Sequence, residues 1–330
     1  MSARRLGILG FASNSGLGTL SREFFVHLKP ERTLLVPTKY QEFPDRFPGA
    51  RRGLTAENID WLFGGIDTLL TFETPGGEWS IYQMARKRGV KTILIPMYEC
   101  APSPLPVIPD TVLCPSKLDL RIFRQELRGK CDVEYLPIPV NRDRIPFRAR
   151  HRAEVFEHHA GHGGLLGRNG TYELLAAAPM LKSKAKILIY SQRKLDFEHP
   201  NVEVRVGNFE DYWNIWGGGD VFVFPHKFDG LSLPIQEALS SGMPVLSTAI
   251  EPFLGWLPQD WMIDAGEHTQ MRVFQRSVDV AVIDPAQIAA KIDEWYGKDI
   301  RGDSSKANKL AQALDWQVLK KKYRDLINSL

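Results

Sequence analysis

The sequence predicts an α/β protein of two domains, each built around a parallel sheet. Short apolar segments alternate with segments of helical period along most of the 330 residues, a pattern typical of parallel strands joined by helices. A Pro-rich segment near the middle interrupts the alternation, which then starts again. A chain of this length also suits two domains of roughly 150 residues each.

The first half alternates strands and helices. We expect a strand at 6–9, a loop at 10–19 that carries Gly16 and Gly18, and a helix at 20–28. Further elements are expected in this order: strands at 33–36 and 68–71, a helix at 80–87, strands at 91–95 and 111–114, and a helix at 117–126. The first domain is therefore expected to span residues 1–140.

A linker separates the two domains. Pro137 and Pro139 make the chain extended and stiff there, and we place the linker at 141–150. Five arginines follow the prolines, up to Arg152. They could contact a polyanion, although a solvated run of charge is the commoner explanation for such a pattern.

The second half repeats the alternation from residue 151. We expect strands at 153–158, 186–190, 202–206, 221–224 and 245–246. Helices are expected at 171–181, with Thr171 as N-cap, from near Pro234 to Gly242, at 285–295 and at 316–330. A Gly-rich loop, 161–170, joins the first of these strands to its helix.

Composition is that of a soluble globular protein. Hydrophobic residues make up 43% and charged residues 25% of the chain, both ordinary values, and the net charge of +3 does not require a nucleic-acid partner. Three cysteines without metal-ligand spacing favour a reduced, cytoplasmic protein. The run 6–11 is too short for a signal peptide, and no segment reaches the ~18 apolar residues of a membrane helix. Peripheral attachment at a membrane surface remains open.

The most informative segment is 222–248, FVFPHKFDGLSLPIQEALSSGMPVLST. Its loop, Asp229 to Ser232, follows a strand and precedes a helix, the place where ligands bind in open α/β sheets. Free N–H groups at such a helix start favour phosphate. Two carboxylates, Asp229 and Glu237, bracket the segment with seven residues between them.

This segment resembles the E-x7-E signature of retaining glycosyltransferases of the GT-B fold, most closely family 4, with Asp229 where that family usually has Glu. The loop 158–171 resembles the family's phosphate-binding strand–loop–helix, with Asn169 where Lys is usual. The resemblance implies two Rossmann-like domains facing each other across a cleft. It also implies that the final helix, 313–330, crosses back to the first domain, which leaves 151–312 for the second.

The resemblance implies transfer of a sugar from a nucleotide diphosphate sugar to an acceptor hydroxyl, with retention and without metal or other cofactor. Glu237 would bind the donor ribose, and Asp229 the transferred sugar. Arg168 would neutralise the diphosphate, with Arg193 or Lys194 as a second cation. The remaining donor-binding residues would lie in the two Gly-containing loops: Gly16, Gly18, Gly230, Leu231, Ser232 and Leu233.

The acceptor side is expected in the first domain. Glu73 and Glu99 each follow an apolar strand, and either one can orient the acceptor hydroxyl; a carboxylate that caps a helix explains each of them equally well. A donor linked to UDP or GDP is expected. The acceptor is left open among a glycan, a lipid-linked sugar, a small molecule, a protein and modified DNA, and the oligomeric state is left open too.

Two other functions are compatible with the sequence. One is a sugar-nucleotide epimerase or hydrolase on the same fold, since a fold does not determine a function. The other is a non-catalytic nucleotide-sugar-binding protein, suggested by Asp229 and Asn169. A zinc site at His158, His159 and His162 is disfavoured, because structural zinc needs four ligands and no other cluster supplies them.

Overall fold

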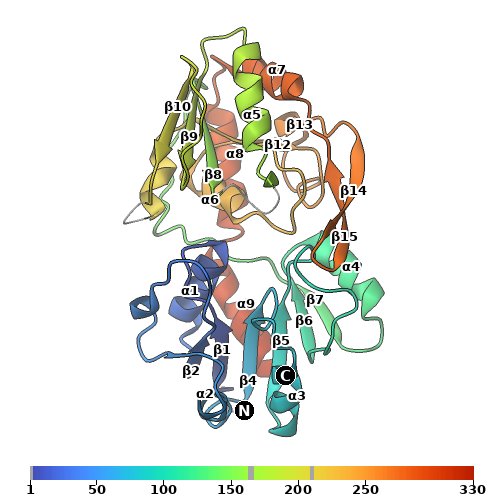
Figure 1. Ribbon diagram of the computed structural model, residues 1–330. Coiled ribbons are helices and arrows are strands. Elements are labelled where there is room, and N and C mark those ends of the chain that lie inside the picture. Colours follow the sequence, from blue (N-terminus) through green and yellow to red (C-terminus); the bar gives the residue numbers. More distant parts are fainter. Residues whose placement is uncertain (1–2, 163–166, 209–211) are drawn as a thin grey trace. The chain divides into compact units, whose positions relative to one another are not determined.

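The computed structural model describes residues 3–162, 167–208 and 212–330 (Figure 1). The chain forms two compact units. Unit 1 consists of Met1–Pro139, Arg272–Arg276 and Trp316–Leu330, and unit 2 of Val140–Met271 and Ser277–Asp315. The change of unit after Pro139 falls within the stiff Pro-rich segment.

Unit 1 contains a parallel seven-stranded sheet in the order β3-β2-β1-β4-β5-β6-β7. The strands are β1 (Leu6–Gly10), β2 (Arg32–Leu35), β3 (Arg51–Arg52), β4 (Thr68–Phe72), β5 (Lys91–Ile95), β6 (Thr111–Cys114) and β7 (Asp132–Tyr135). The order reverses between β1 and β4, as in a doubly wound Rossmann-like domain. β1 and β4 are buried along their whole length, which explains why neither strand alternates between apolar and charged residues.

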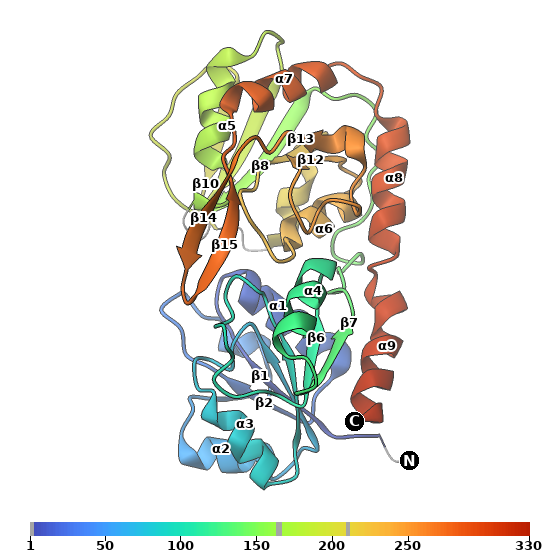
Figure 2. The same cartoon turned by 90° about the vertical axis from the view of Figure 1, so that its right-hand side faces the viewer.

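The helices of unit 1 are α1 (Gly16–Leu28), α2 (Ala56–Phe63), α3 (Ser80–Lys87), α4 (Lys117–Glu126) and α9 (Trp316–Ser329). The last of them packs against the first (Figure 2). The Phe24 ring of α1 lies 5.0 Å from the rings of both Trp316 and Tyr323, and the Tyr323 hydroxyl donates to the Pro137 carbonyl at 3.0 Å. The expected return of the C-terminal helix to the first domain is confirmed.

Unit 2 repeats the design with a parallel six-stranded sheet in the order β10-β9-β8-β11-β12-β13. The strands are β8 (Val155–Gly161), β9 (Lys186–Ser191), β10 (Val202–Val206), β11 (Val221–Phe224), β12 (Val245–Thr248) and β13 (Met262–Ile263). A two-stranded ribbon, β14 (His268–Val273) and β15 (Arg276–Ala281), lies apart from this sheet. The order reverses between β8 and β11, so the loops that follow these two strands lie at the switch point.

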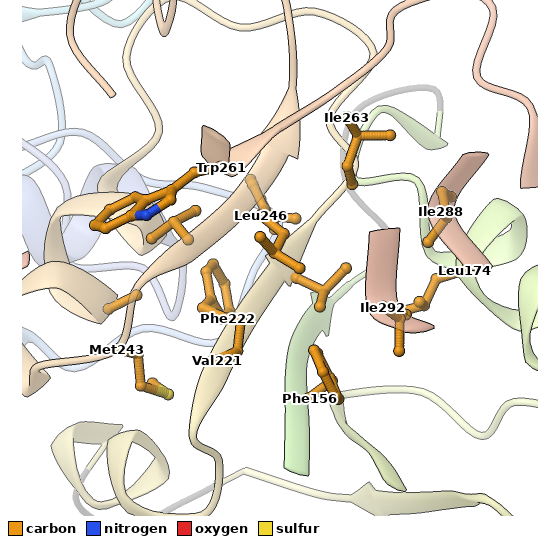
Figure 3. Close-up of a cluster of buried hydrophobic side chains, with 14 of the residues drawn as sticks. Phe156, Leu174, Val221, Phe222, Met243, Leu246, Trp261, Ile263, Ile288 and Ile292 are labelled. Atoms are coloured by element: carbon orange, nitrogen blue, oxygen red, sulfur yellow. The ribbon is translucent and has the colours of Figure 1, made fainter. Parts of the chain in front are cut away.

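The helices of unit 2 are α5 (Thr171–Ala177), α6 (Leu233–Ser241), α7 (Pro285–Trp295) and α8 (Arg301–Gln312). α5 packs against α7, and α6 against α8 (Figure 2). Between these pairs lies the core of unit 2, in which Phe156 and Phe222 of the sheet, Trp261 and Ile292 are fully buried (Figure 3). Short 3-10 helices occur at Pro44–Arg46, Ala178–Met180, Tyr212–Gly217 and Gln259–Trp261.

Several element bounds differ from expectation. α1 begins at Gly16, because the Ser15 hydroxyl accepts the Gly18 N–H and caps the helix; the prediction of a loop up to residue 19 was wrong. Thr171 is the first residue of α5 and Gly170 is its N-cap. The sequence reading missed α2, α8, β3, β7 and β13–β15, which are short, edge or polar elements.

The arginines after the linker prolines are not all a solvated run of charge. Arg150 is buried, and its guanidinium donates to the carbonyls of Trp216 and Ser241, at 3.3 and 3.4 Å. Ser241 ends α6, so the cation faces the negative end of a helix dipole. Arg142 contacts Asp315 and Asn308. The expectation of a solvated run is wrong for these two residues.

Among the described residues, no helix has the length and apolar character required to cross a membrane.

We predict that Phe24→Ala lowers the free energy of unfolding by about 3–5 kcal/mol, because it leaves a cavity between α1 and α9. Urea unfolding of the full chain measures the change. Val26→Ala, on the exposed side of the same helix, is the matched control and should change stability by less than about 0.5 kcal/mol. Equal effects of the two substitutions would contradict the described packing.

Candidate donor site in unit 2 and carboxylates of unit 1

Two loops at the switch point of unit 2 lie against each other. Gly170 has a φ of +68°, and a Cβ at this position would lie 2.0 Å from the Pro225 carbonyl oxygen. Only glycine permits so close an approach with this backbone conformation. The Lys227 N–H donates to the Arg168 carbonyl at 2.9 Å, which joins the loop after β8 to the loop after β11.

This junction brings Arg168 to Asp229. The Arg168 Nη1 atom lies 3.6 Å from Asp229 Oδ1, and His226 Nδ1 lies 2.7 Å from Asp229 Oδ2. The Leu231 N–H donates to Asp229 Oδ1 at 3.3 Å. Burial alone would raise the pKa of Asp229, but the charges of His226 and Arg168 and these hydrogen bonds lower it well below its usual range. Asp229 is therefore an ionised carboxylate in a buried position.

The start of α6 adds free donors to the same loop. Ser232 is its N-cap residue, with left-handed φ and ψ of 63° and 85°, and its side chain does not cap the helix. The Ser232 hydroxyl is buried and makes no hydrogen bond within the described parts of the chain. Gly230 and Leu231 are buried beside it, and Leu233 is half-buried. A helix start of this kind, next to an arginine, is suited to an anion.

Glu237 lies one turn inside α6 and is buried. The Tyr212 hydroxyl, from the 3-10 helix after β10, donates to Glu237 Oε2. The Glu237 carboxylate thus already accepts a hydrogen bond from a hydroxyl group.

Arg193 and Lys194 lie in an exposed loop after β9, where Lys194 pairs with Asp196 at 3.6 Å. Their assignment to donor binding stays a prediction.

In unit 1, the expected acceptor-side residues lie at neighbouring strand ends. Glu73 is the first residue after β4 and has a φ of 54°, which is unusual for a residue with a side chain. Glu99 lies in the turn after β5 and is buried. Because β4 and β5 pair in parallel, the carboxyl ends of both strands lie on one edge of the sheet.

Gly16 and Gly18 lie in the first turn of α1 and not in a loop. A Cβ on Gly18 would lie 1.9 Å from the Ser13 carbonyl oxygen, so this glycine is required by the close packing of the helix start against the chain before it. Whether either glycine contacts a donor stays a prediction.

The histidines of β8 have structural partners. His158 contacts the Val223 carbonyl at 2.9 Å and the Thr171 hydroxyl at 2.8 Å, and His159 Nε2 contacts Glu157 Oε1 at 2.8 Å. Within 3–162, 167–208 and 212–330, no group of three or more His, Cys, Asp or Glu residues is arranged to hold a metal ion.

Sequence reasoning missed two residues of the site. The sequence analysis does not single out His226, although its position three residues before Asp229 and two residues after the end of β11 is a usable signal. Tyr212 could not have been found, because only the packing of the segment after β10 brings it to Glu237. The remaining residues of the expected loop, 163–166, lie outside the described residues.

Comparison with known proteins gives a consistent result. Residues 161–296 match the family model described as Glycosyl transferases group 1. No curated protein matches the chain significantly. Three solved structures with similar folds illustrate the likeness. Sucrose-phosphate synthase from Thermosynechococcus elongatus has 12% identity, coverage of 99% of this chain and 100% of that one, and a TM-score of 0.70. HepE from Anabaena, in complex with UDP-glucose, has 10% identity, coverage of 99% and 100%, and a TM-score of 0.72. The lipopolysaccharide outer core galactosyltransferase WaaB has 12% identity, coverage of 98% and 99%, and a TM-score of 0.65. These likenesses show the GT-B fold.

We predict that Ser232→Gly raises the free energy of unfolding by about 1 kcal/mol, because glycine adopts a left-handed conformation without strain. Thermal unfolding of the unliganded chain measures the change. Ser232→Ala is the matched control: it also removes the buried hydroxyl but keeps a side chain in the strained conformation, so it should stabilise less. A glycine variant less stable than the native protein would show that Ser232 is not strained.

Proposed function

We propose that this glycosyltransferase, whose group 1 domain lies in unit 2, takes a sugar from a nucleotide diphosphate sugar and transfers it with retention and without a metal ion. The observation that carries the proposal is the pair of half-buried Arg168 and buried Asp229 beside the start of α6. It combines a cation, free helix N–H groups and a carboxylate at the switch point of the sheet.

The diphosphate is assigned to the start of α6. When the bond between the sugar and the diphosphate breaks, negative charge develops on the leaving phosphate, and fixed donors aimed at that charge lower the barrier. The N–H groups of Gly230, Ser232 and Leu233, the Ser232 hydroxyl and the Arg168 guanidinium are such donors, whereas the Leu231 N–H already donates to Asp229. Gly230 and Ser232 are buried, which strengthens the electrostatic effect because the local dielectric constant is lower than that of water.

The two carboxylates are assigned to different parts of the donor. Glu237 accepts from the Tyr212 hydroxyl in the unliganded chain, and we propose that ribose hydroxyls replace this contact when the donor binds. Asp229 lies ahead of α6, where its carboxylate can accept from hydroxyls of the transferred sugar. Its ionised state suits this role, because an ionised carboxylate acts only as a hydrogen-bond acceptor and can accept from two sugar hydroxyls.

The transfer itself needs few further groups. The acceptor oxygen forms a bond to the anomeric carbon on the face from which the phosphate oxygen departs, and the acceptor proton passes to that phosphate oxygen. Glu73 and Glu99 of unit 1 are proposed to orient the acceptor hydroxyl.

HepE binds UDP and UDP-glucose, so we propose a UDP-linked donor, with a GDP-linked donor as the second choice. For the acceptor we keep the classes named from the sequence: a glycan, a lipid-linked sugar, a small molecule, a protein or modified DNA.

We predict that Glu237→Ala weakens binding of both UDP-glucose and bare UDP, by about 1.5–3 kcal/mol each, because a charged acceptor of both ligands is lost. Asp229→Ala should weaken UDP-glucose binding and lower transfer but leave UDP binding almost unchanged. Calorimetric titration of each variant with each ligand makes the comparison. Equal effects of both substitutions on both ligands would contradict this division of roles.

A further prediction concerns the charge that stabilises the leaving group. Transfer in excess EDTA should equal transfer with added Mg²⁺, because Arg168 and α6 supply the positive charge. Arg168→Met should lower kcat by about 10²-fold under both conditions, whereas Arg205→Met, on the exposed side of β10, should not. Loss of turnover in EDTA that Mg²⁺ restores would refute the metal-independent mechanism. Binding of UDP-glucose without turnover under any condition would instead indicate a binding protein.

A further inference from the structure

His226 is held between two oxygen atoms in the interior of unit 2. Its Nδ1 atom lies 2.7 Å from Asp229 Oδ2, and its Nε2 atom lies 3.2 Å from Asn169 Oδ1. The orientation of the Asn169 amide follows from its other contact, in which Nδ2 donates to the Ala160 carbonyl at 3.1 Å. Asn169 must therefore present its oxygen to His226, because the reverse orientation would place two oxygen atoms together at Ala160.

The number of protons on the ring follows from these contacts. A neutral imidazole carries one N–H and one lone pair. In the neutral form a ring nitrogen of His226 would therefore place its lone pair close to an oxygen atom, either 3.2 Å from Asn169 Oδ1 or 2.7 Å from the ionised Asp229 Oδ2. In a site where His226 is 1% exposed, such a contact is costly. The imidazolium donates from Nε2 to Asn169 Oδ1 and places its positive charge 2.7 Å from the Asp229 carboxylate, an ion pair in which the Nδ1–H is not aligned with Oδ2 for a hydrogen bond.

The surrounding charges determine how readily the ring takes up the second proton. Burial lowers the pKa of His226 below its usual value, the Asp229 carboxylate offsets only part of this lowering, and Arg168 adds a smaller lowering. His158 on β8 is uncharged at neutral pH, since burial lowers its pKa to about 3. The other neighbours are the Phe224 ring at 4.5 Å and the Phe253 ring at 6.4 Å, which carry no charge. The Asn169 acceptor acts in the same direction as Asp229.

We propose that Asn169 is a positioning residue that favours a doubly protonated His226, and that this imidazolium is a second, pH-dependent cation of the donor site. With His226 neutral, Arg168 and Asp229 cancel. With His226 protonated, the three groups together carry one positive charge. The proposal rests on the proposed function only in assigning that charge to a nucleotide diphosphate sugar.

The consequence is a dependence of donor affinity on pH. A bound diphosphate stabilises the imidazolium and raises the pKa of His226, so affinity should be greatest below the pKa of the free protein. It should fall as pH rises through that pKa and level off above the pKa of the complex. Each unit of difference between the two pKa values corresponds to about a tenfold change in Kd. UDP-glucose is the suitable probe, because its diphosphate is esterified at both ends and lacks the phosphate ionisation near pH 6.

The direct test is ¹⁵N NMR of the histidine side chains in the full chain, with and without Asn169→Leu. Native His226 should carry N–H at both nitrogens at low pH, and in Asn169→Leu its pKa should fall by about one unit, the effect of one hydrogen bond to a charged group. His268, which pairs with Asp279 on the exposed β14–β15 ribbon, is the internal control and should titrate unchanged. Equal titration of His226 in both proteins, or a neutral ring down to pH 5, would overturn the proposal.

Asn169→Asp provides a second variant if the leucine variant does not fold. It keeps the acceptor oxygen and adds charge, so the pKa of His226 should rise above the native value; a fall would overturn the proposal. In a parallel arm, calorimetry with UDP-glucose from pH 5.5 to pH 8 should show about a tenfold weakening in the native protein and less in His226→Gln. If UDP-glucose binds at no pH, the proposed function fails, and the NMR arm still decides the state of His226.

Discussion

The close approach of Gly170 to the Pro225 carbonyl is the constraint on which the donor-side geometry depends. It holds two loops from different strands in backbone contact, and Arg168, Asn169, His226 and Asp229 are neighbours only because those loops touch. The parallel sheet makes this possible, since β8 and β11 end at the same edge and the connections leave in opposite directions. Any side chain at residue 170 would separate the loops.

Charge balance is the second organising feature of the site. Asp229 is buried and ionised, which a protein tolerates only when the charge is paired and hydrogen-bonded. Arg168, His226 and the Leu231 N–H supply that compensation. The two departures from the pattern of the family that the sequence resembles lie together: Asp229 pairs with His226, and Asn169, where that family usually has lysine, contacts the same ring.

Away from the site, each unit contains stabilising contacts between elements that lie far apart in the sequence. α9 packs on Phe24 of α1 through Trp316 and Tyr323, so the ends of the chain fold into one body. Arg276, the first residue of β15, forms a two-atom pair with Glu126 of α4 at 2.6 and 3.0 Å within unit 1. Arg150 caps the C-terminal carbonyl group of α6 from the linker.

The sequence by itself determined the strand–helix alternation, the restart after Pro139, and the loop Asp229–Ser232 with Glu237 one turn beyond it, because buried parallel strands and helix starts have local signatures. It also placed β5, β6, β11, α3, α4 and α7 at their observed bounds. Tertiary structure alone decided the polar helix α8, the ribbon β14–β15, and the contacts of His226 with Asn169 and of Tyr212 with Glu237. These features depend on which segments meet in space. Neither residue type nor spacing along the chain shows that the His226 ring lies between Asp229 and Asn169, the contacts on which its protonation depends.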